Sequence, residues 1–357
     1  MRALITGVCG FVGSAIASGL IKAKEKVEII GLDNLSRPGS QLNVAPLRAL
    51  GVKVRHADVR LASDMEALTG IDWIIDAAAN PSVLAGVVGE TTSRQVVQHN
   101  LDGSINLLEL AKQTKACFTL LSTSRVYSIK SLCQIPVVQK DGAYAFDQDS
   151  PLTPGISSAG IAETFSTTAP ISIYGATKLA SETLALEYGS AFGFPVWINR
   201  CGVLAGAGQF GRPDQGIFSY WMNAYLRREP LRYIGFNGRG YQTRDCFHPR
   251  DLVPLLLKQF HCASEPEQRI VNLGGGGANA MSLRQLSDWC ATRFGEHPVY
   301  STTEARPFDL PWVVMDYGLA EKIWEWAPQT NLHSILEEIA SHAEANSDWL
   351  RISAAYD

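Results

Sequence analysis

The first 33 residues constrain the fold of this chain most, because they join two apolar strands through a glycine-rich turn and a helix. Residues 2–6 have the composition of a short strand, and the run Gly7-Val-Cys-Gly10-Phe-Val-Gly13 follows at once. Helical periodicity covers 11–22, and a second apolar strand at 27–32 ends at Asp33. Glycines at such a turn let the backbone approach a pyrophosphate at the helix N-terminus, and an acid after the second strand suits ribose hydroxyls. The stretch therefore predicts a βαβ unit that binds a dinucleotide.

The spacing of these glycines differs from the commonest dinucleotide fingerprint, so a tight turn without a ligand is the alternative. The context favours binding, because a strand precedes the turn, a helix follows it, and Asp33 lies twenty positions past Gly13. Asp33 also favours NAD over NADP, since a carboxylate repels a 2′-phosphate. Arg37 argues in the other direction, because it could pair with such a phosphate.

Strands and helices alternate over the first 200 residues. Further apolar strands are expected at 52–58, 73–80, 117–123 and 195–200. This alternation predicts an α/β fold with a doubly wound parallel sheet, the Rossmann arrangement, followed by a smaller C-terminal lobe for the substrate. In such sheets the ligand crevice lies at the carboxyl ends of the strands.

Three of the expected strand ends carry residues that suit a ligand crevice. Asp58 and Val59 follow the third strand, where an adenine edge could be read. The small residues Ala77, Ala78 and Ala79 follow the fourth, where close strand–helix packing explains them as well as an approaching cofactor does. The fifth strand ends in the hydroxyl side chains of 122–124.

The second part of the chain interrupts the alternation. Residues 128–173 are irregular and rich in Pro, Gly, Ser and Thr, and a long loop of this kind is usually functional. We expect a NAD-binding domain over 1–200, to which 244–262 returns, and a substrate-binding lobe mainly over 201–357. The glycines of 274–277 resemble a phosphate loop, but no Lys-Ser/Thr follows, so we interpret them as the exit of a strand within the lobe. An amphipathic helix is expected at 330–346.

A tyrosine and a lysine four positions apart, Tyr174 and Lys178, lie on one face of the helix predicted from about 172 to 188. Ser172 is a candidate N-cap. An ammonium about 5 Å from a phenol, at an effective dielectric near 20, favours the phenolate by about 3 kcal/mol, or roughly two pK units. Burial would act against this effect, and a bound nicotinamide cation would add to it. By itself the pair also fits an ordinary solvated helix face.

Composition excludes several other classes of function. The chain of 357 residues is 46% hydrophobic and 18% charged, with a net charge of −4. It therefore offers no excess of basic residues for nucleic acid or anionic lipid. No apolar run reaches the roughly 20 residues of a membrane span, and no secretory signal is recognisable. The seven cysteines have no metal-ligand spacing, which favours reduced thiols in a cytoplasmic protein; we interpret Cys9 as a small filler.

Taken in order, these motifs resemble the extended short-chain dehydrogenase/reductases that modify nucleotide sugars, the NAD-dependent epimerase/dehydratase group. The run Ser122-Thr-Ser-Arg-Val-Tyr127 matches this group, and so do Arg244-Asp-Cys-Phe-His-Pro-Arg-Asp251 and Arg306-Pro-Phe-Asp309. Within it the chain is most similar to the CDP-paratose 2-epimerase group. Three features carry that finer resemblance: the run that begins at Gly160, the run Gln209-Phe-Gly-Arg-Pro-Asp-Gln215, and a threonine at 123.

The resemblance implies an epimerase that oxidises a sugar hydroxyl transiently and restores it with the opposite configuration, at C2 of a CDP-linked deoxyhexose. Tyr174 would be the general base and acid, Thr123 would bind the reacting oxygen, and Lys178 would hold the nicotinamide ribose. Other residues would bind the cofactor NAD: Gly7, Gly10, Phe11, Gly13, Asp33, Asn34, Ser36, Arg37, Asp58, Val59, Ala77, Ala78, Ala79 and Asn100. Packing explains Asn100 equally well. The substrate would be held by Asn80, Thr123, Gln209, Arg244 and Arg306, with the two arginines on the diphosphate.

Three departures from the group concern the identity of the sugar and base. Asp76 stands at the usual histidine position, Val203 at that of an asparagine, and Ala205 at that of a tyrosine. The rival activities are a 4-epimerase and a 4,6-dehydratase or decarboxylase. The latter two place an acid just after the threonine, where this chain has Ser124 and Arg125.

A third rival is an NAD-binding sensor without turnover. The resemblance further implies a homodimer, or a tetramer built from dimers, formed through helices near 103–115 and 176–192. No nucleic acid, membrane or metal is expected as a partner.

Overall fold

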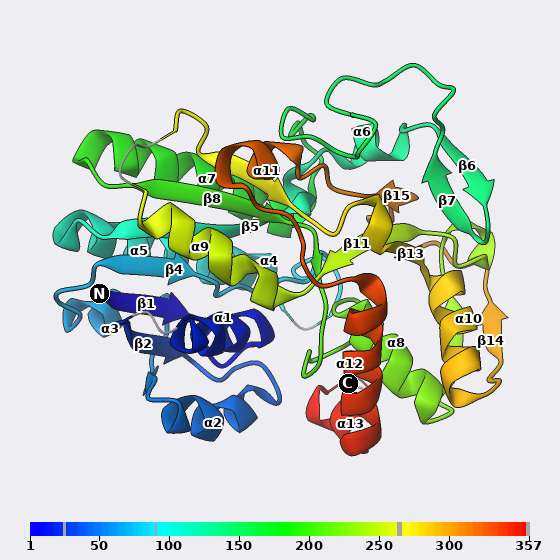
Figure 1. Cartoon of the computed structure of the whole chain (residues 1–357), viewed down its shortest axis with the longest axis horizontal. Helices are drawn as coiled ribbons and strands as arrows, with labels where there is room; N and C mark the ends of the chain where they lie inside the picture. Colours follow the sequence, from blue (N-terminus) through cyan, green and yellow to red (C-terminus); the bar gives the residue numbers. More distant parts are fainter. Residues whose placement is uncertain (24–25, 90, 263–265, 355–357) are drawn as a thin grey trace.

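A computed structural model describes residues 1–23, 26–89, 91–262 and 266–354. Its centre is a seven-stranded sheet (Figure 1) in which every neighbouring pair of strands is parallel. The strands follow the order β12 (Ile270–Leu273), β8 (Val196–Cys201), β5 (Cys117–Thr123), β4 (Trp73–Asp76), β1 (Arg2–Thr6), β2 (Glu28–Asp33) and β3 (Lys53–His56). The chain crosses from β3 over to β4 on the other side of β1. This reversal confirms the predicted Rossmann arrangement.

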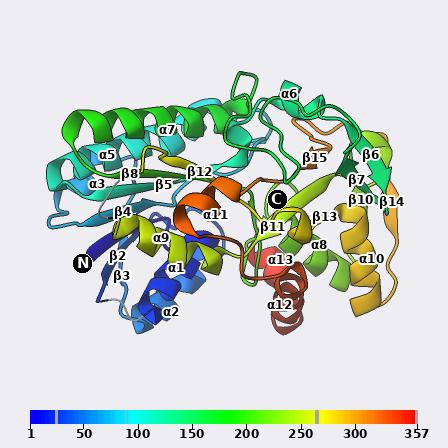
Figure 2. The same ribbon diagram turned by 45° about the horizontal axis from the view of Figure 1, so that its top comes forward.

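Helices cover both faces of this sheet, as Figure 2 shows. One hydrophobic cluster joins the sheet to α1 (Phe11–Lys22), α2 (Val44–Ala49), α9 (Leu252–Phe260) and α11 (Gly318–Trp324). A second cluster joins its other face to α5 (Gly103–Thr114), α7 (Ser172–Phe192) and the short α3 (Ala62–Glu66). Apart from the edge strand β3, which is largely exposed, the strands are buried on both sides, which explains why they read as continuous apolar runs.

Local sequence accounts for the limits of α7. The Ser172 hydroxyl accepts a hydrogen bond from the Gly175 N–H at 3.1 Å, so this residue supplies the capping bond although it is itself the first residue of the helix. At the other end Gly193 adopts φ 66°, a left-handed conformation that glycine enters without the strain of a Cβ atom. The helix is longer than predicted, because nothing breaks its pattern between these two positions.

Two segments differ from the expectations. The strand Ile270–Leu273, which we placed in the lobe, pairs with β8 as the edge of the main sheet. The segment 128–173 is not structureless: it contains α6 (Ile129–Cys133) and a hairpin of β6 (Val137–Lys140) and β7 (Ala143–Phe146). The sequence pattern did not predict β6 and β7, because these strands are short and tertiary contacts set their register.

The remaining elements form the lobe at the carboxyl ends of the main strands. A small sheet contains β9 (Val203–Leu204), β11 (Thr243–Phe247), β13 (Ala280–Ser282) and β15 (Trp312–Val313), and β10 (Leu231–Tyr233) pairs with β14 (Val299–Ser301). A hydrophobic cluster of its own unites α8 (Ile217–Leu226), α10 (Leu283–Phe294), α12 (Leu332–Ala345) and α13 (Trp349–Ile352). No helix among the described residues is long and apolar enough to cross a membrane.

Candidate active site

The glycine turn is packed too closely for side chains. Gly7 adopts φ +60°, and its carbonyl accepts the Gly10 N–H at 2.9 Å. A Cβ atom on Gly13 would lie 2.2 Å from the Gly7 oxygen, and one on Gly7 would lie 3.0 Å from the Cα of Ala78. The start of α1 therefore sits directly on the turn, with the exit of β4 beside it. This arrangement leaves backbone, rather than side chains, at the helix N-terminus.

Asp33 closes the turn from the end of β2. Its carboxylate accepts hydrogen bonds from the backbone N–H groups of Cys9 and Leu35, both at 2.8 Å. Burial raises the pKa of Asp33, while these bonds oppose the rise. Burial also raises the pKa of the Cys9 thiol to about 12, which agrees with our interpretation of Cys9 as a filler rather than a nucleophile.

Other predicted cofactor residues gather beyond β2 and β3. The Asn34 amide donates to the Asp58 carboxylate at 3.1 Å, and the Ser36 N–H donates to the Asn34 side chain at 3.1 Å. A 2.6 Å ion pair with Arg60 lowers the pKa of Asp58. The Arg37 guanidinium donates to the Phe210 carbonyl at 2.5 Å, so it connects this edge to the segment that follows β9. Val59 packs against the first residue of α5.

The aspartate at the usual histidine position, Asp76, is buried at the end of β4. It accepts hydrogen bonds from the hydroxyls of Thr6 at 2.9 Å and Ser104 at 2.7 Å. Thr6 Oγ1 in turn accepts the N–H groups of Ala77 and Ala78. The carboxylate thus organises the start of the alanine run through Thr6, and the alanines pack closely against the glycine turn.

Asn100 joins the cofactor side of the site to α7. It lies in a π-helical turn, Gln98–Asp102, between α4 (Ser93–Val97) and α5. Its side chain accepts the Asn80 N–H at 2.8 Å and donates to the Asn80 carbonyl at 3.1 Å and to the Thr177 hydroxyl at 3.3 Å. Its backbone oxygen accepts the Ser181 hydroxyl. These contacts support the interpretation of Asn100 as helix support, and π-turns of this kind are frequent at functional sites.

The structure brings Thr123 and Tyr174 together at the end of β5. Both side chains are buried, at 8% and 6% exposure, and a hydrogen bond links them. Burial raises the pKa of Tyr174 to about 12, against the lowering effects of this bond and of the positive charge of Arg125. We expected the pKa of the phenol to move toward neutral pH. For the chain alone this expectation is wrong, because the loss of water raises the pKa more than the hydrogen bond and the charge of Arg125 lower it.

Lys178 is buried as well, at 2% exposure. Burial lowers the pKa of its ammonium, while the negative charges of Asp76 and Glu182 act in the opposite direction.

Three arginines lie close together, two from the lobe and one from the turn after β5. Arg244 donates to the Leu310 carbonyl at 2.8 Å and lies 3.7 Å from the Asp309 carboxylate. Arg306 donates to the Pro213 carbonyl at 3.2 Å. The third, Arg125, lies near enough to both for their positive charges to lower its pKa, although burial is the larger cause. We predicted Arg244 and Arg306 as binding residues and assigned no role to Arg125, whose place just after Thr123 was the available signal.

A buried ion pair between α7 and β8, next to β5, was also missed by the sequence analysis. Glu182 and Arg200 lie 2.6 Å apart with exposures of 2% and 6% for their side chains, and the Ser122 hydroxyl donates to the same carboxylate. Glu182 stands one helical turn after Lys178, the spacing that could have indicated it. The pair fastens α7 to β8 and β5.

Gln209 and the glycines of 274–277 have contacts within the lobe. Gln209 donates to the Leu204 carbonyl at 2.7 Å, and its own amide oxygen is buried without a partner among the described residues. The glycines after β12 direct the Gly276 N–H to the Asp245 carboxylate at 3.0 Å, which agrees with a strand exit rather than a phosphate loop. Within the described ranges, no group of three or more His, Cys, Asp or Glu could hold a metal.

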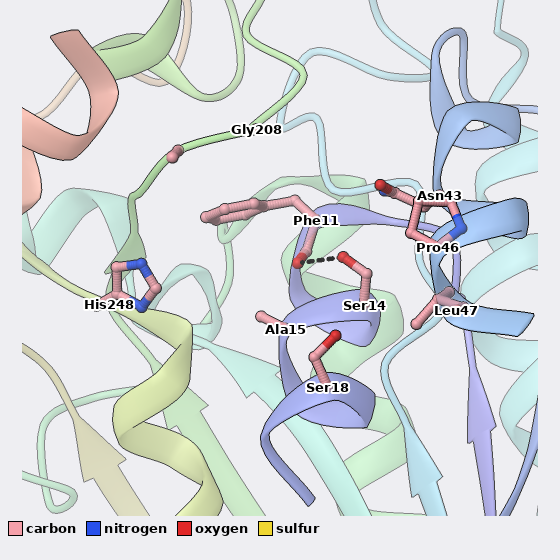
Figure 3. A pocket seen from close by; sticks show the side chains of 10 residues that line it. Phe11, Ser14, Ala15, Ser18, Asn43, Pro46, Leu47, Gly208 and His248 are labelled. Atoms are coloured by element: carbon pink, nitrogen blue, oxygen red, sulfur yellow. Dashed lines mark hydrogen bonds between the residues drawn. The ribbon is translucent and has the colours of Figure 1, made fainter. Parts of the chain in front are cut away.

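An open pocket of about 210 Å³ lies outside this constellation (Figure 3). Side chains of α1 line one wall and those of the segment that contains α2 the other, and His248 lies across from Phe11. It contains none of the residues Thr123, Tyr174 and Lys178.

Known proteins are similar to this chain in sequence and in fold over almost its whole length. A CDP-paratose 2-epimerase from Salmonella typhi is 29% identical, covering 93% of this chain and 96% of the relative. A UDP-glucuronate 4-epimerase from Thermodesulfobacterium geofontis is 25% identical, covering 98% of both. The crystal structure of UDP-glucuronic acid 4-epimerase from Bacillus cereus, in complex with UDP-glucuronic acid and NAD, superposes with a TM-score of 0.79 at 23% identity, covering 97% of this chain and 99% of that one.

The model of one protein family matches residues 3–274, which include the glycine turn, Tyr174 and Lys178. This match covers most of the chain, and the protein therefore belongs to the NAD-dependent epimerase/dehydratase family.

Proposed function

We propose that this enzyme is an NAD-dependent epimerase of a nucleotide sugar, which inverts C2 of a CDP-linked deoxyhexose through a transient keto-sugar. The observation that carries the proposal is the meeting of Thr123 and Tyr174 at the carboxyl end of β5, between the glycine turn and the arginines of the lobe. The relative from Salmonella typhi supports the choice of sugar and carbon, because it covers both chains almost completely.

The residues of the glycine turn fit the cofactor of the family. Side chains on Gly7 or Gly13 would collide with backbone, so the turn presents N–H groups to a pyrophosphate. Asp33 would hold the adenosine ribose, and Asn34, Ser36 and Arg37 would line that end of the site. When bound, NAD supplies reversible hydride acceptance, and the chain supplies positioning and proton transfer.

In the proposed mechanism Tyr174 takes the proton of the sugar hydroxyl as the carbon is oxidised, and it returns a proton to the same oxygen when the carbon is reduced from its other face. Thr123 would hold that oxygen by a hydrogen bond. Arg244 and Arg306 would exchange their present carbonyl partners for oxygens of the diphosphate, for which a guanidinium is better suited. The diphosphate would then anchor the substrate while the sugar turns.

The residues after Thr123 argue against dehydration and decarboxylation. Ser124 and Arg125 occupy the positions where we expect an acid in those enzymes. Burial and the neighbouring arginines lower the pKa of Arg125 to about 9, which still leaves it protonated at neutral pH. It therefore cannot take up a proton there.

The second candidate is a nucleotide-sugar 4-epimerase. It is supported by the UDP-glucuronate 4-epimerase relative, which covers 98% of both chains. The two activities use the same residues and differ in which hydroxyl meets Tyr174.

We further propose a cytoplasmic homodimer, or a tetramer of dimers, formed through α5 and α7, and a division into the two domains given above. No disulfide joins the cysteines that the structure describes, which supports a reducing compartment. Light scattering after gel filtration tests the oligomer, with a monomer at micromolar concentration as the contradictory result.

A screen of CDP-, UDP-, GDP- and dTDP-sugars by NMR tests the activity. The purified enzyme should contain NAD and invert C2 of a CDP-deoxyhexose. A substrate deuterated at C2 should keep its label in the product, because the same hydrogen returns to the carbon that it left. Tyr174→Phe should lower turnover by roughly 10²–10⁴ while leaving NAD bound. Inversion at C4, or release of a dehydrated product, would contradict the assignment, and unchanged turnover in Tyr174→Phe would contradict the mechanism.

A further inference from the structure

Arg125 is held against the two residues at the centre of the site. It lies in a 3-10 turn, Ser124–Val126, that follows β5 directly. Its N–H donates to the Thr123 hydroxyl oxygen at 3.2 Å. The same hydroxyl group is hydrogen-bonded to the phenol of Tyr174, so Thr123 connects the backbone of Arg125 to Tyr174.

The first turn of α7 is packed onto the backbone of Arg125. A Cβ atom on Gly175 would lie 2.2 Å from the Arg125 carbonyl oxygen, a distance at which no side chain fits. The glycine next to Tyr174 therefore allows the helix to touch the turn. Thr123, Arg125 and Tyr174 are positioned together by this close contact rather than by flexible side chains alone.

The guanidinium of Arg125 has no carboxylate in direct contact among the residues that the structure describes. Its hydrogen bond goes to the Phe308 carbonyl at 3.3 Å. Asp309 is the acid near it, and that carboxylate already lies 3.7 Å from Arg244 and accepts the Gln242 amide at 2.8 Å. A half-buried positive charge with only a neutral partner is costly unless an anion forms beside it.

We propose that Arg125 acts through Tyr174, as a positioning residue whose positive charge stabilises the phenolate that accepts the proton of the sugar hydroxyl. The inference rests on the proposed function. The proton passes from the hydroxyl to the phenolate oxygen and later returns, and Arg125 stays protonated throughout, since an arginine does not exchange protons at neutral pH.

The charges of Arg125 and Tyr174 affect each other in the direction that this role requires. The positive charge of Arg125 lowers the pKa of Tyr174, and the negative charge of an ionised Tyr174 raises the pKa of Arg125. Burial meanwhile lowers the pKa of Lys178, while the charges of Asp76 and Glu182 raise it. An arginine keeps its charge when buried more readily than a lysine does.

The test compares Arg125→Gln with the charge-preserving control Arg125→Lys. The pH profile of kcat should have an acid limb that reports ionisation of Tyr174, and Arg125→Gln should move this limb to higher pH by about one unit. At pH 7 about ten-fold less phenolate, and hence about ten-fold lower kcat, is expected. Arg125→Lys should restore most of the loss, and circular dichroism should show that both variants are folded.

Two readouts do not depend on turnover. In protein labelled with ¹³C at the tyrosine ring, the signal that disappears in Tyr174→Phe should titrate at higher pH in Arg125→Gln than in the wild type. The Kd for CDP should be unchanged in Arg125→Gln but raised in Arg244→Gln.

A raised Kd for CDP or a raised KM in Arg125→Gln, with the pH profile unmoved, would instead make Arg125 a contact for an anionic group of the substrate and overturn the proposal. Unchanged kcat and an unchanged titration of Tyr174 would also overturn it. If no nucleotide sugar is epimerised, the proposed function fails, but the titration of the phenol still decides the role of Arg125.

Discussion

Burial changes both members of the Tyr-x-x-x-Lys pair in directions that oppose proton abstraction. It raises the pKa of Tyr174 to about 12 and lowers that of Lys178. The spacing of the two residues allowed us to estimate the attraction between ammonium and phenolate. It did not allow us to estimate the free-energy cost of removing water from them, because burial depends on the whole fold. The hydrogen bond from Thr123 and the positive charge of Arg125 offset part of the rise in the pKa of Tyr174.

A second buried side chain gives the protein a predictable response to acid. The Nδ1 atom of His248 accepts the Arg250 N–H at 3.0 Å, which requires a ring that is unprotonated at this nitrogen. Burial and the charge of Arg250 lower the pKa of His248 to about 4. The unfolded chain, with a pKa near 6.5, binds more protons between these values, so the folded state loses stability as the pH falls from about 6.5 to about 4.

His248→Asn keeps an acceptor for the Arg250 N–H without a group that titrates in this range. We expect the free energy of unfolding of the wild type, relative to this variant, to decline by up to about 1.4 kcal/mol per pH unit over the window. Urea unfolding at pH 4.5, 5.5, 6.5 and 7.5 measures the difference. A constant difference across the series would contradict a neutral buried ring.

At the scale of elements, α7 carries Tyr174 and Lys178 and is fastened to the sheet by the pair Glu182–Arg200. Removing one member would leave the other charge buried without a partner, which typically costs about 3–5 kcal/mol. We therefore expect Arg200→Met to lower the free energy of unfolding by several kcal/mol. The double replacement of Glu182 and Arg200 by Met should recover much of that loss, because no charge is then left buried.

Urea unfolding of the two single variants and the double variant provides the cycle that isolates the interaction. A double variant whose loss of stability equals the sum of the two single losses would show that Glu182 and Arg200 contribute independently, and it would contradict a penalty from the orphaned charge.

The elements differ in how much the sequence alone could establish. Apolar runs and periodicity predicted α1 and six of the seven strands of the main sheet, because neighbouring elements bury most of this sheet. They did not predict the hairpin β6–β7 or the place of β12 at the edge of the sheet, since partners distant in sequence determine both. Within the site, short motifs predicted Thr123, Tyr174 and the arginines of the lobe. The contacts of Arg125 and Glu182 could not be predicted from the sequence, because they arise from the packing of α7 on the turn after β5 and on β8.

At the scale of the whole molecule, residues 209–215 form a strap between the two parts of the chain. A residue predicted to bind the cofactor and one predicted to bind the substrate both reach its backbone: Arg37 donates to the Phe210 carbonyl at 2.5 Å, and Arg306 donates to the Pro213 carbonyl at 3.2 Å. The Ser82 hydroxyl donates to Asp214 at 2.5 Å. The C-terminal helix α13 supports the strap from behind. Its Trp349 stacks on Phe210 with ring centroids 5.3 Å apart and donates from Nε1 to the Gln209 carbonyl at 2.8 Å.

This arrangement predicts that a residue far along the chain controls substrate affinity without touching the glycine turn. Trp349→Ala should release the strap and raise the KM for the nucleotide sugar by about ten-fold, which corresponds to about 1.4 kcal/mol of lost binding. The NAD content of the purified protein should stay the same, because the turn and Asp33 are held by α1 and β2. Trp349→Phe, which keeps the stacking but loses the N–H donor, should have an intermediate KM. A folded Trp349→Ala variant with the KM of the wild type would show that the strap keeps its place without α13.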